Sequence, residues 1–192
     1  MGATAERLSP ETAVLAAAPV CALLRDKEGA VDVLFQHIAE RARGAGLHLA
    51  GALQRDEPHL GRSRCDMVLI DLASGRRTPI SWDRGDLAAG CRLDQSALTE
   101  AAELVERSIR AAPLDLVIVN KFGKAEAEQR GGMRDAIAAA IDASVPVLTG
   151  VAPAYASALR DFAGETCVLA GDEDGVSRWL ASHLGSFDGY GA

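Results

Sequence analysis

Lysine is scarce in this 192-residue chain, and its distribution is uneven. The sequence holds 20 lysines and arginines together, of which only Lys27, Lys121 and Lys124 are lysines. Two of the three lie within four residues of each other, directly after the apolar run 114–120. A chain that otherwise uses arginine therefore places two ammonium groups at the end of one strand-like segment.

Other absences limit the class of protein. The net charge of −7 and the pI near 5.1 argue against nucleic acid or an anionic membrane as the main partner. No apolar run reaches the length of a membrane span, and Glu6, Arg7 and Glu11 interrupt the apolar core that a secretory leader needs. We therefore expect a cytoplasmic protein. A hydrophobic content of 48% over this length predicts one globular domain.

The four cysteines show no spacing typical of a disulfide framework. No C-x-x-C pair occurs, and Cys21 and Cys167 lie inside apolar runs, where a small buried side chain is the usual role. Cys91 stands in a Gly-Cys-Arg loop before a helix, and Cys65 opens a strand. A thiol or soft-metal site formed by these two is an alternative to two packed thiols, although no histidine has matching spacing.

Hydrophobic periodicity predicts strands that alternate with helices. Such alternation is typical of βαβ units in a largely parallel sheet, where ligands bind beyond the carboxyl ends of the strands. Asp32 and Asp94 are the expected N-caps of the first two helices, and Pro113 follows the second. The expected strands are residues 19–24, 47–54, 114–120, 145–151 and 165–170, and the expected helices are residues 32–43, 93–113, 132–143 and 174–183.

The middle of the chain predicts a β-hairpin. Residues 66–72 and 76–81 are strand-like, and the Ser74-Gly75 pair between them is typical of a turn. The expected fold class is therefore α/β, with a mainly parallel sheet, helices on both faces and an inserted antiparallel hairpin. The expected organisation is an irregular lead-in at 1–18, a single domain at 19–185 and a frayed tail at 186–192.

The first strand, loop and helix can be compared with the phosphate-binding pattern G-x-x-x-x-G-K-[ST]. The corresponding window is LRDKEGAV, residues 24–31, in which Gly29 alone matches. Backbone N–H groups at the helix N-terminus can still face an anion, and Arg25 and Lys27 can supply positive charge. Three positions are lost, since Leu24, Ala30 and Val31 replace the first glycine, the phosphate-binding lysine and the magnesium-binding hydroxyl.

The order of the segments resembles the small nucleoside-triphosphatase family of P-loop proteins. The resemblance is carried by GLHLAGALQ, SRCDMVLIDLASGRR, LDLVIVNKFGKAE and VPVLTGV, within residues 20–152. Gly123, Lys124 and Glu126 match the G-K-x-E segment of that family. The resemblance implies a P-loop NTPase-like sheet with its ligand site at the carboxyl end of strand 114–120.

The departures from that family fall where hydrolysis takes place. Asn120 and Lys121 stand at the family's Asp and Glu, which order magnesium and orient the attacking water. An amide binds a divalent cation more weakly than a carboxylate does, and a protonated ammonium cannot act as a base. These changes imply a fold without magnesium-dependent phosphoryl transfer, so we expect neither a metal site nor catalytic residues, and no cofactor is identified.

The chain is also similar to a bacterial family of degenerate P-loop proteins that shares the segments RCDM, GCRLD and NKFGK. In this sequence the segments are residues 64–67, 90–94 and 120–124, and the similarity extends over nearly the whole chain. It implies no particular activity. It does imply oxyanion handling in the context of molybdate uptake.

Lys121 and Lys124 lead the candidate binding residues, because two ammonium groups at the mouth of a sheet can face an anion. The alternative is two solvated lysines beside Glu126 and Glu128. Asn120 is either a ligand or a turn residue that closes the strand. The full set expected around an anion or nucleotide is Arg25, Lys27, Gly29, Arg84, Arg92, Asn120, Lys121, Gly123 and Lys124.

The sequence thus predicts a non-hydrolysing protein that binds a small anion, either a nucleotide or an inorganic oxyanion, as a sensor or accessory factor. Arg84 and Arg92 either grip that anion with their guanidinium groups or are solvated surface residues. The enzymatic alternative is a nucleoside triphosphatase or phosphotransferase that uses Lys27 or Lys121 in place of the lost lysine. A third possibility is an interaction module whose pocket is closed by apolar side chains.

Overall fold

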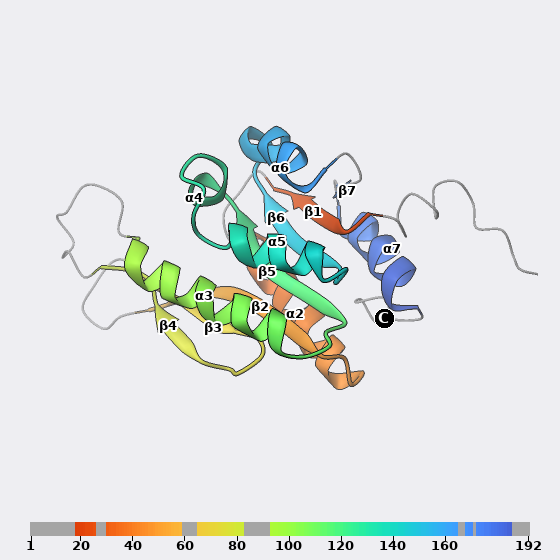
Figure 1. Ribbon diagram of the computed structural model, residues 1–192, viewed down its shortest axis with the longest axis horizontal. Coiled ribbons are helices and arrows are strands. Elements are labelled where there is room, and N and C mark those ends of the chain that lie inside the picture. Colours follow the sequence, from red (N-terminus) through yellow and green to blue (C-terminus); the bar gives the residue numbers. More distant parts are fainter. Residues whose placement is uncertain are drawn as a thin grey trace, which may run out of the picture.

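The computed structural model describes residues 18–25, 30–58, 65–82, 93–164, 168–170 and 172–185 (Figure 1). The described strands are β1 (Val20–Leu24), β2 (Leu49–Glu57), β3 (Asp66–Asp71), β4 (Arg77–Pro79), β5 (Leu116–Phe122), β6 (Val147–Val151) and β7 (Val168–Ala170). They form one sheet of seven strands in the order β4-β3-β2-β5-β6-β1-β7. Pairing is parallel from β2 to β7 and antiparallel between β2, β3 and β4, which confirms the expected sheet and hairpin.

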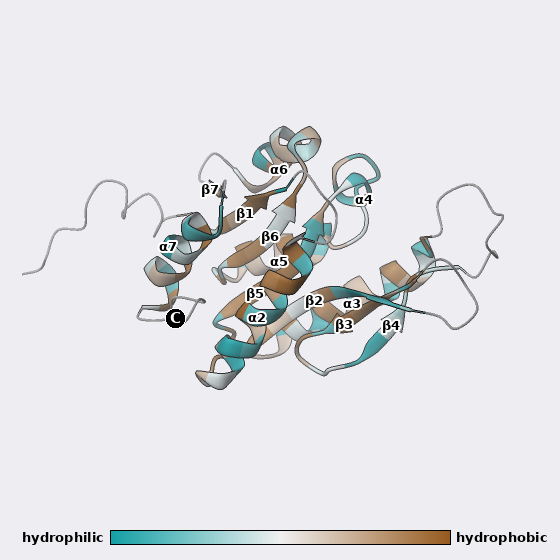
Figure 2. Ribbon diagram, turned by 180° about the vertical axis from the view of Figure 1, so that it is seen from behind, coloured by the Kyte–Doolittle hydropathy of each residue, from teal (hydrophilic) through white to brown (hydrophobic). Residues whose placement is uncertain are grey.

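Helices cover both faces of this sheet. They are α2 (Ala30–Gly44), α3 (Gln95–Ala111), α4 (Lys124–Ala127), α5 (Arg134–Asp142), α6 (Ala156–Ala163) and α7 (Glu173–Leu184), with a 3-10 turn η1 at Pro153–Tyr155. α3, α5 and α6 pack with Val117 and Val119 of β5, whereas α2 and α7 pack with Leu116 and Ile118. β5 is therefore buried on both sides, and β1 and α5 are mostly apolar as well (Figure 2). None of the described helices combines the length and hydropathy that a bilayer span requires.

The start of α3 agrees with the sequence, and the starts of two other helices do not. Asp94 caps α3 by accepting hydrogen bonds from the N–H groups of residues 96 and 97 at 3.0 and 3.1 Å. α2 begins at Ala30, so Asp32 lies in its first turn and is not its N-cap. α7 begins at Glu173, one residue before the expected start at 174, and is capped by Asp172, whose side chain accepts from the Gly175 N–H.

Two helical segments were not expected from the pattern. α4 follows the Gly-Lys loop at once, and η1 leads into α6 after β6. The helix expected from residue 132 begins at Arg134, because the preceding residues form the turn between α4 and α5. Both additions lie at the carboxyl edge of the sheet (Figure 1), which is where the candidate binding residues were placed.

β5 has a bulge at its carboxyl end. Its register with β6 shifts between Val119 and Phe122, where Asn120 and Lys121 together oppose the single residue Gly150. Because side chains alternate along a strand, the extra residue moves Phe122 onto the face of Val119. The bulge therefore changes which side chains of the expected site face each layer of helices.

β2 and β5 approach each other most closely at Gly51. This glycine has φ of +116°, and a Cβ built on it would lie 2.0 Å from the carbonyl oxygen of Ile118. Any side chain at this position would therefore have to push the central strand pair apart.

We expect Gly51→Ala to lower the free energy of unfolding by about 3 kcal/mol or more, through backbone strain and the steric clash. Gly44→Ala is the matched control, because no heavy atom lies within 4 Å of the added Cβ there. Denaturant titration of both variants measures the difference. Equal stability of the two variants would contradict the close approach of the strands.

Candidate functional site

A small polar niche lies where the carboxyl ends of β1, β5 and β6 meet the first turn of α2. Asn120 is 5% exposed, and its Nδ2 donates a hydrogen bond of 2.9 Å to Oδ1 of Asp32. Nη1 of Arg25 lies 3.9 Å from the same carboxylate oxygen. The niche therefore contains a carboxylate that is already partnered by an amide and a guanidinium group.

Two polar atoms of this niche have no hydrogen-bond partner among the described residues. They are Nη1 of Arg25 and Oδ1 of Asn120, and both are buried. Leaving a buried polar atom unpaired costs about 1–3 kcal/mol. The niche thus offers one donor and one acceptor that a bound molecule can satisfy.

Gly150 allows the parts of the niche to come together. A Cβ at this position would lie 3.0 Å from the carbonyl oxygen of Asn120, 3.2 Å from Cγ1 of Val31 and 3.5 Å from Cδ of Arg25. A larger side chain at position 150 would push β5 away from α2 and from Arg25. The position of Gly150 opposite the bulge of β5 therefore has a packing reason.

A pocket of about 610 Å³ lies on the α3 side of the sheet, next to this niche. Its volume is within the range of sites for small organic molecules, roughly 300–1,000 Å³. Residues from β2, β3, β5, α3 and α4 surround it, so the hairpin and the Gly-Lys segment form two of its walls. The lining residues are Ala52, Gln54, Asp56, Cys65, Met67, Leu69, Ile80, Leu93, Leu98, Val119, Asn120, Lys121, Gly123, Lys124, Ala125, Glu126 and Met133.

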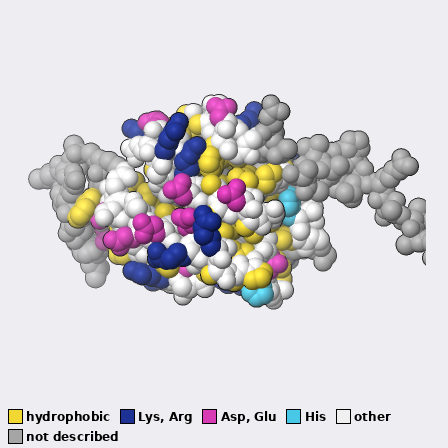
Figure 3. Space-filling view, viewed as in Figure 1, with side chains coloured by type: hydrophobic (Ala, Val, Ile, Leu, Met, Phe, Trp, Pro, Cys, Tyr) yellow, Lys and Arg dark blue, Asp and Glu magenta, His cyan; other side chains and the backbone are white. Residues whose placement is uncertain are grey.

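The two lysines of the pocket differ in their surroundings. Lys121 is half-buried and makes no hydrogen bond or ion pair with any other described residue. The side chain of Lys124 is 67% exposed, and its Nζ lies 3.8 Å from Oε2 of Glu128. The solvated-lysine alternative thus describes Lys124 better than Lys121. Acidic and basic side chains intermingle on the face that carries α3 and α5 (Figure 3), so charge is not concentrated in one broad patch there.

Glu126 organises the segment between β5 and α5. It is 5% exposed, and its carboxylate accepts hydrogen bonds from the Gly123 N–H at 2.9 Å and the Met133 N–H at 3.0 Å. Its carbonyl oxygen accepts from Nη1 of Arg134. Gly132 has φ of +60°, and a Cβ on it would lie 2.1 Å from Oε1 of Glu126. Glu126 is therefore a structural residue that positions Gly123 and Lys124 along the pocket.

The structure places the predicted residues in three groups. Asn120, Lys121, Gly123 and Lys124 lie along one wall of the pocket, whereas Arg25 lies in the niche beside Asn120. The remaining expected residues, Lys27, Gly29, Arg84 and Arg92, lie outside the described residues, as does Cys91.

Two residues important for the site were missed in the sequence. Asp32 was expected to cap a helix, and its partner Asn120 is 88 residues away in the chain, so no local signal shows the contact. Glu126 was noted only as part of a motif, and its burial depends on the turn that follows α4. The described residues contain no group of three or more His, Cys, Asp or Glu side chains that could hold a metal ion.

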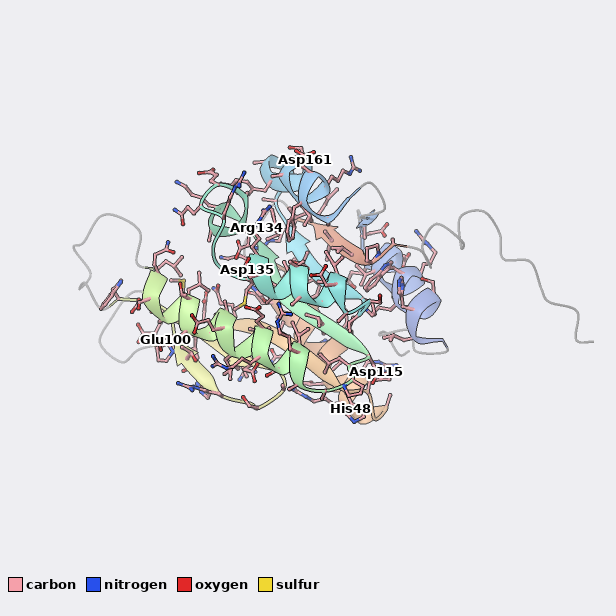
Figure 4. All side chains as sticks on the ribbon, viewed as in Figure 1. His48, Glu100, Asp115, Arg134, Asp135 and Asp161 are labelled. Atoms are coloured by element: carbon pink, nitrogen blue, oxygen red, sulfur yellow. The ribbon has the colours of Figure 1, made fainter. Side chains whose placement is uncertain are left out.

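Further charged residues lie at both edges of the sheet (Figure 4). Arg134 and Asp135 lie near α4 at the carboxyl edge, while His48 and Asp115 are at the opposite edge of the sheet. There the His48 N–H donates to Oδ2 of Asp115 at 2.7 Å, which ties β2 to the start of β5. The His48–Asp115 pair is structural and does not contribute to the pocket.

Comparison with known proteins identifies the family. The family described as "Protein of unknown function (DUF2478)" matches residues 20–179. The chain belongs to this family. Part of "Molybdenum import ATP-binding protein ModC 2" from Bradyrhizobium diazoefficiens is 36% identical over 145 residues, which cover 76% of this chain and 16% of that relative.

A solved structure supports the fold. THEP1 from Aquifex aeolicus matches with a TM-score of 0.51 and 13% sequence identity, covering 79% of this chain and 88% of that chain. The expected α/β architecture is confirmed, and the chain shares its overall fold with THEP1. At this identity the likeness concerns the fold alone.

We expect Glu126→Ala to lower the free energy of unfolding by about 3 kcal/mol, because two buried N–H groups would lose a charged acceptor. Glu128→Ala is the matched control, since its ion pair with Lys124 is exposed and should change stability by no more than about 0.5 kcal/mol. Urea denaturation of both variants tests the difference. A Glu126→Ala protein as stable as the control would show that this carboxylate does not hold the segment together.

Proposed function

We propose that this protein binds a small anion, a nucleotide or an oxyanion, at the carboxyl edge of its sheet without hydrolysing it. The observation that carries the proposal is the half-buried Lys121 in the wall of an open pocket. Partial burial raises the cost of a charge that has no opposite charge beside it, and a bound anion offsets that cost. The exposed Lys124 adds positive charge at the same wall.

The polar niche supports binding without hydrolysis. Asn120 and Lys121 occupy the positions where P-loop hydrolases need carboxylates for magnesium and water. Asp32 brings a carboxylate into this region, but Arg25 and Asn120 already partner it. A carboxylate whose charge is offset by a guanidinium group attracts a divalent cation weakly.

The context of the proposed binding is molybdate handling. The partial relative is named a molybdenum import ATP-binding protein, and this chain corresponds to 16% of its length. We therefore propose that the protein acts as a sensor or accessory factor beside molybdate import. The open pocket favours ligand binding over an interaction module with a closed site.

We expect a specific anion to raise the melting temperature of the wild-type protein in the absence of magnesium. At a concentration about 100 times its Kd, the ligand adds about 2.7 kcal/mol, or roughly 5–10 °C for a protein of this size. Lys121→Ala should abolish most of the shift. The panel comprises ATP, GTP, ADP, phosphate, sulfate, molybdate and tungstate, each with and without magnesium, in a thermal-shift assay.

The control for lost positive charge is Arg110→Ala. This side chain is exposed and pairs with Glu106 on α3, outside the pocket. The variant should keep the full shift. Stabilisation of the wild-type protein by none of the anions would overturn the proposal. Magnesium-dependent ATP or GTP turnover that disappears in Lys121→Ala would instead establish the nucleoside triphosphatase.

A further inference from the structure

The walls of the pocket point to a ligand larger than an inorganic anion. Apart from the lysine end, the wall is formed largely by apolar side chains from β3, α3 and the start of α5. The chain has three methionines, and both internal ones, Met67 and Met133, line the pocket. Thioether side chains adapt to irregular shapes and make favourable contacts with aromatic rings. An inorganic oxyanion would fill only a small part of this volume and leave the apolar wall exposed.

An exposed tryptophan lies directly after the pocket wall. Trp82 is 48% exposed, whereas the second tryptophan of the chain, Trp179, is fully buried in the core. Trp82 comes two residues after Ile80, which lines the pocket. Ser81, the residue between them, is bridged to Leu93, so the backbone of Trp82 adjoins the pocket wall, and its side chain is outside the set that lines the pocket.

The backbone just before Trp82 is held to β3 and to Leu93. The Ile80 N–H donates to the carbonyl oxygen of Met67 at 2.8 Å, and the Met67 N–H donates to Oγ of Ser81 at 3.0 Å. Ser81 also forms a β-bridge with Leu93, another lining residue. The indole is therefore carried by a segment whose position relative to the pocket wall is set by hydrogen bonds.

We infer that the anion of the proposed function belongs to an organic molecule with a flat aromatic ring, and that Trp82 stacks on this ring at the pocket mouth. The ring would lie between the indole and the apolar wall, while the anionic group faces Lys121. This inference rests on the proposed function and makes Trp82 a specificity-determining residue. It also explains why a large aromatic side chain is exposed beside an apolar pocket.

The test compares ligands that share a phosphate and differ in the ring. FMN, GMP and 1-naphthyl phosphate carry an aromatic ring, whereas ribose 5-phosphate and inorganic phosphate do not. Isothermal titration of the wild-type protein should give a lower Kd for at least one aromatic probe than for ribose 5-phosphate and for inorganic phosphate. Trp82→Ala should raise the Kd of that aromatic probe about tenfold or more, the usual effect of losing one stacking partner.

Two controls separate stacking from folding and from charge. Trp82→Phe keeps a flat ring and should retain most of the affinity, and both Trp82 variants should keep the wild-type melting temperature because the side chain is exposed. Binding of ribose 5-phosphate should be the same in Trp82→Ala and in the wild type. In the wild type, a bound aromatic probe should quench the Trp82 fluorescence, whereas the buried Trp179 should contribute no change.

The inference fails if ribose 5-phosphate binds the wild-type protein as tightly as every aromatic probe, or if Trp82→Ala binds the aromatic probes unchanged. Either result leaves the proposed anion site intact when binding still depends on Lys121. If the affinity for an aromatic probe falls in Trp82→Ala but not in Lys121→Ala, the anion site is overturned and the stacking role of Trp82 stands. Failure of all five probes to bind would overturn the inference.

Discussion

The buried carboxylate of Glu126 is the interaction on which the pocket depends. It accepts hydrogen bonds from the N–H groups of Gly123 and Met133, the two ends of an eleven-residue stretch, and so closes the segment that forms the lysine end of the pocket. The left-handed Gly132 leaves room for that carboxylate, and the guanidinium group of Arg134 binds the backbone of the same residue. The hydrogen bonds of Glu126 and the backbone geometry around it thus present Lys124 at the surface.

Asn120 connects the two polar features of the carboxyl edge. Its amide nitrogen donates to Asp32, its buried amide oxygen has no hydrogen-bond partner in the described part of the chain, and the residue also lines the pocket. The hydrogen bond to Asp32 joins β5 to α2 through two side chains. Asn120 therefore contributes both to the packing of α2 on the sheet and to the wall of the pocket.

The sequence predicted those parts of the fold that depend on local pattern. The strands, the hairpin and the Asp94 cap follow from alternation, turn residues and capping chemistry, and each requires only neighbouring residues. The partner of Asp32 and the burial of Glu126 required knowledge of which distant segments meet. The short α6 was missed because it follows a 3-10 turn with no side-chain cap. The predicted residues at 120–124 lie along one wall of a pocket, whereas the contacts that each of them makes depend on tertiary structure.

The bulge in β5 makes the packing of Phe122 depend on the number of residues at the end of this strand. Phe122 stacks on Phe162 with ring centroids 5.9 Å apart, and Arg134 lies over the other ring at 4.0 Å from its centroid. That stack exists only because one additional residue turns Phe122 toward α5 and α6. Deletion of one residue at 120–121 would turn Phe122 to the opposite face of the sheet and so remove the aromatic pair, even if every remaining side chain were kept. The spacing between Val119 and Phe122 is therefore as strongly constrained as the identity of the residues that it separates.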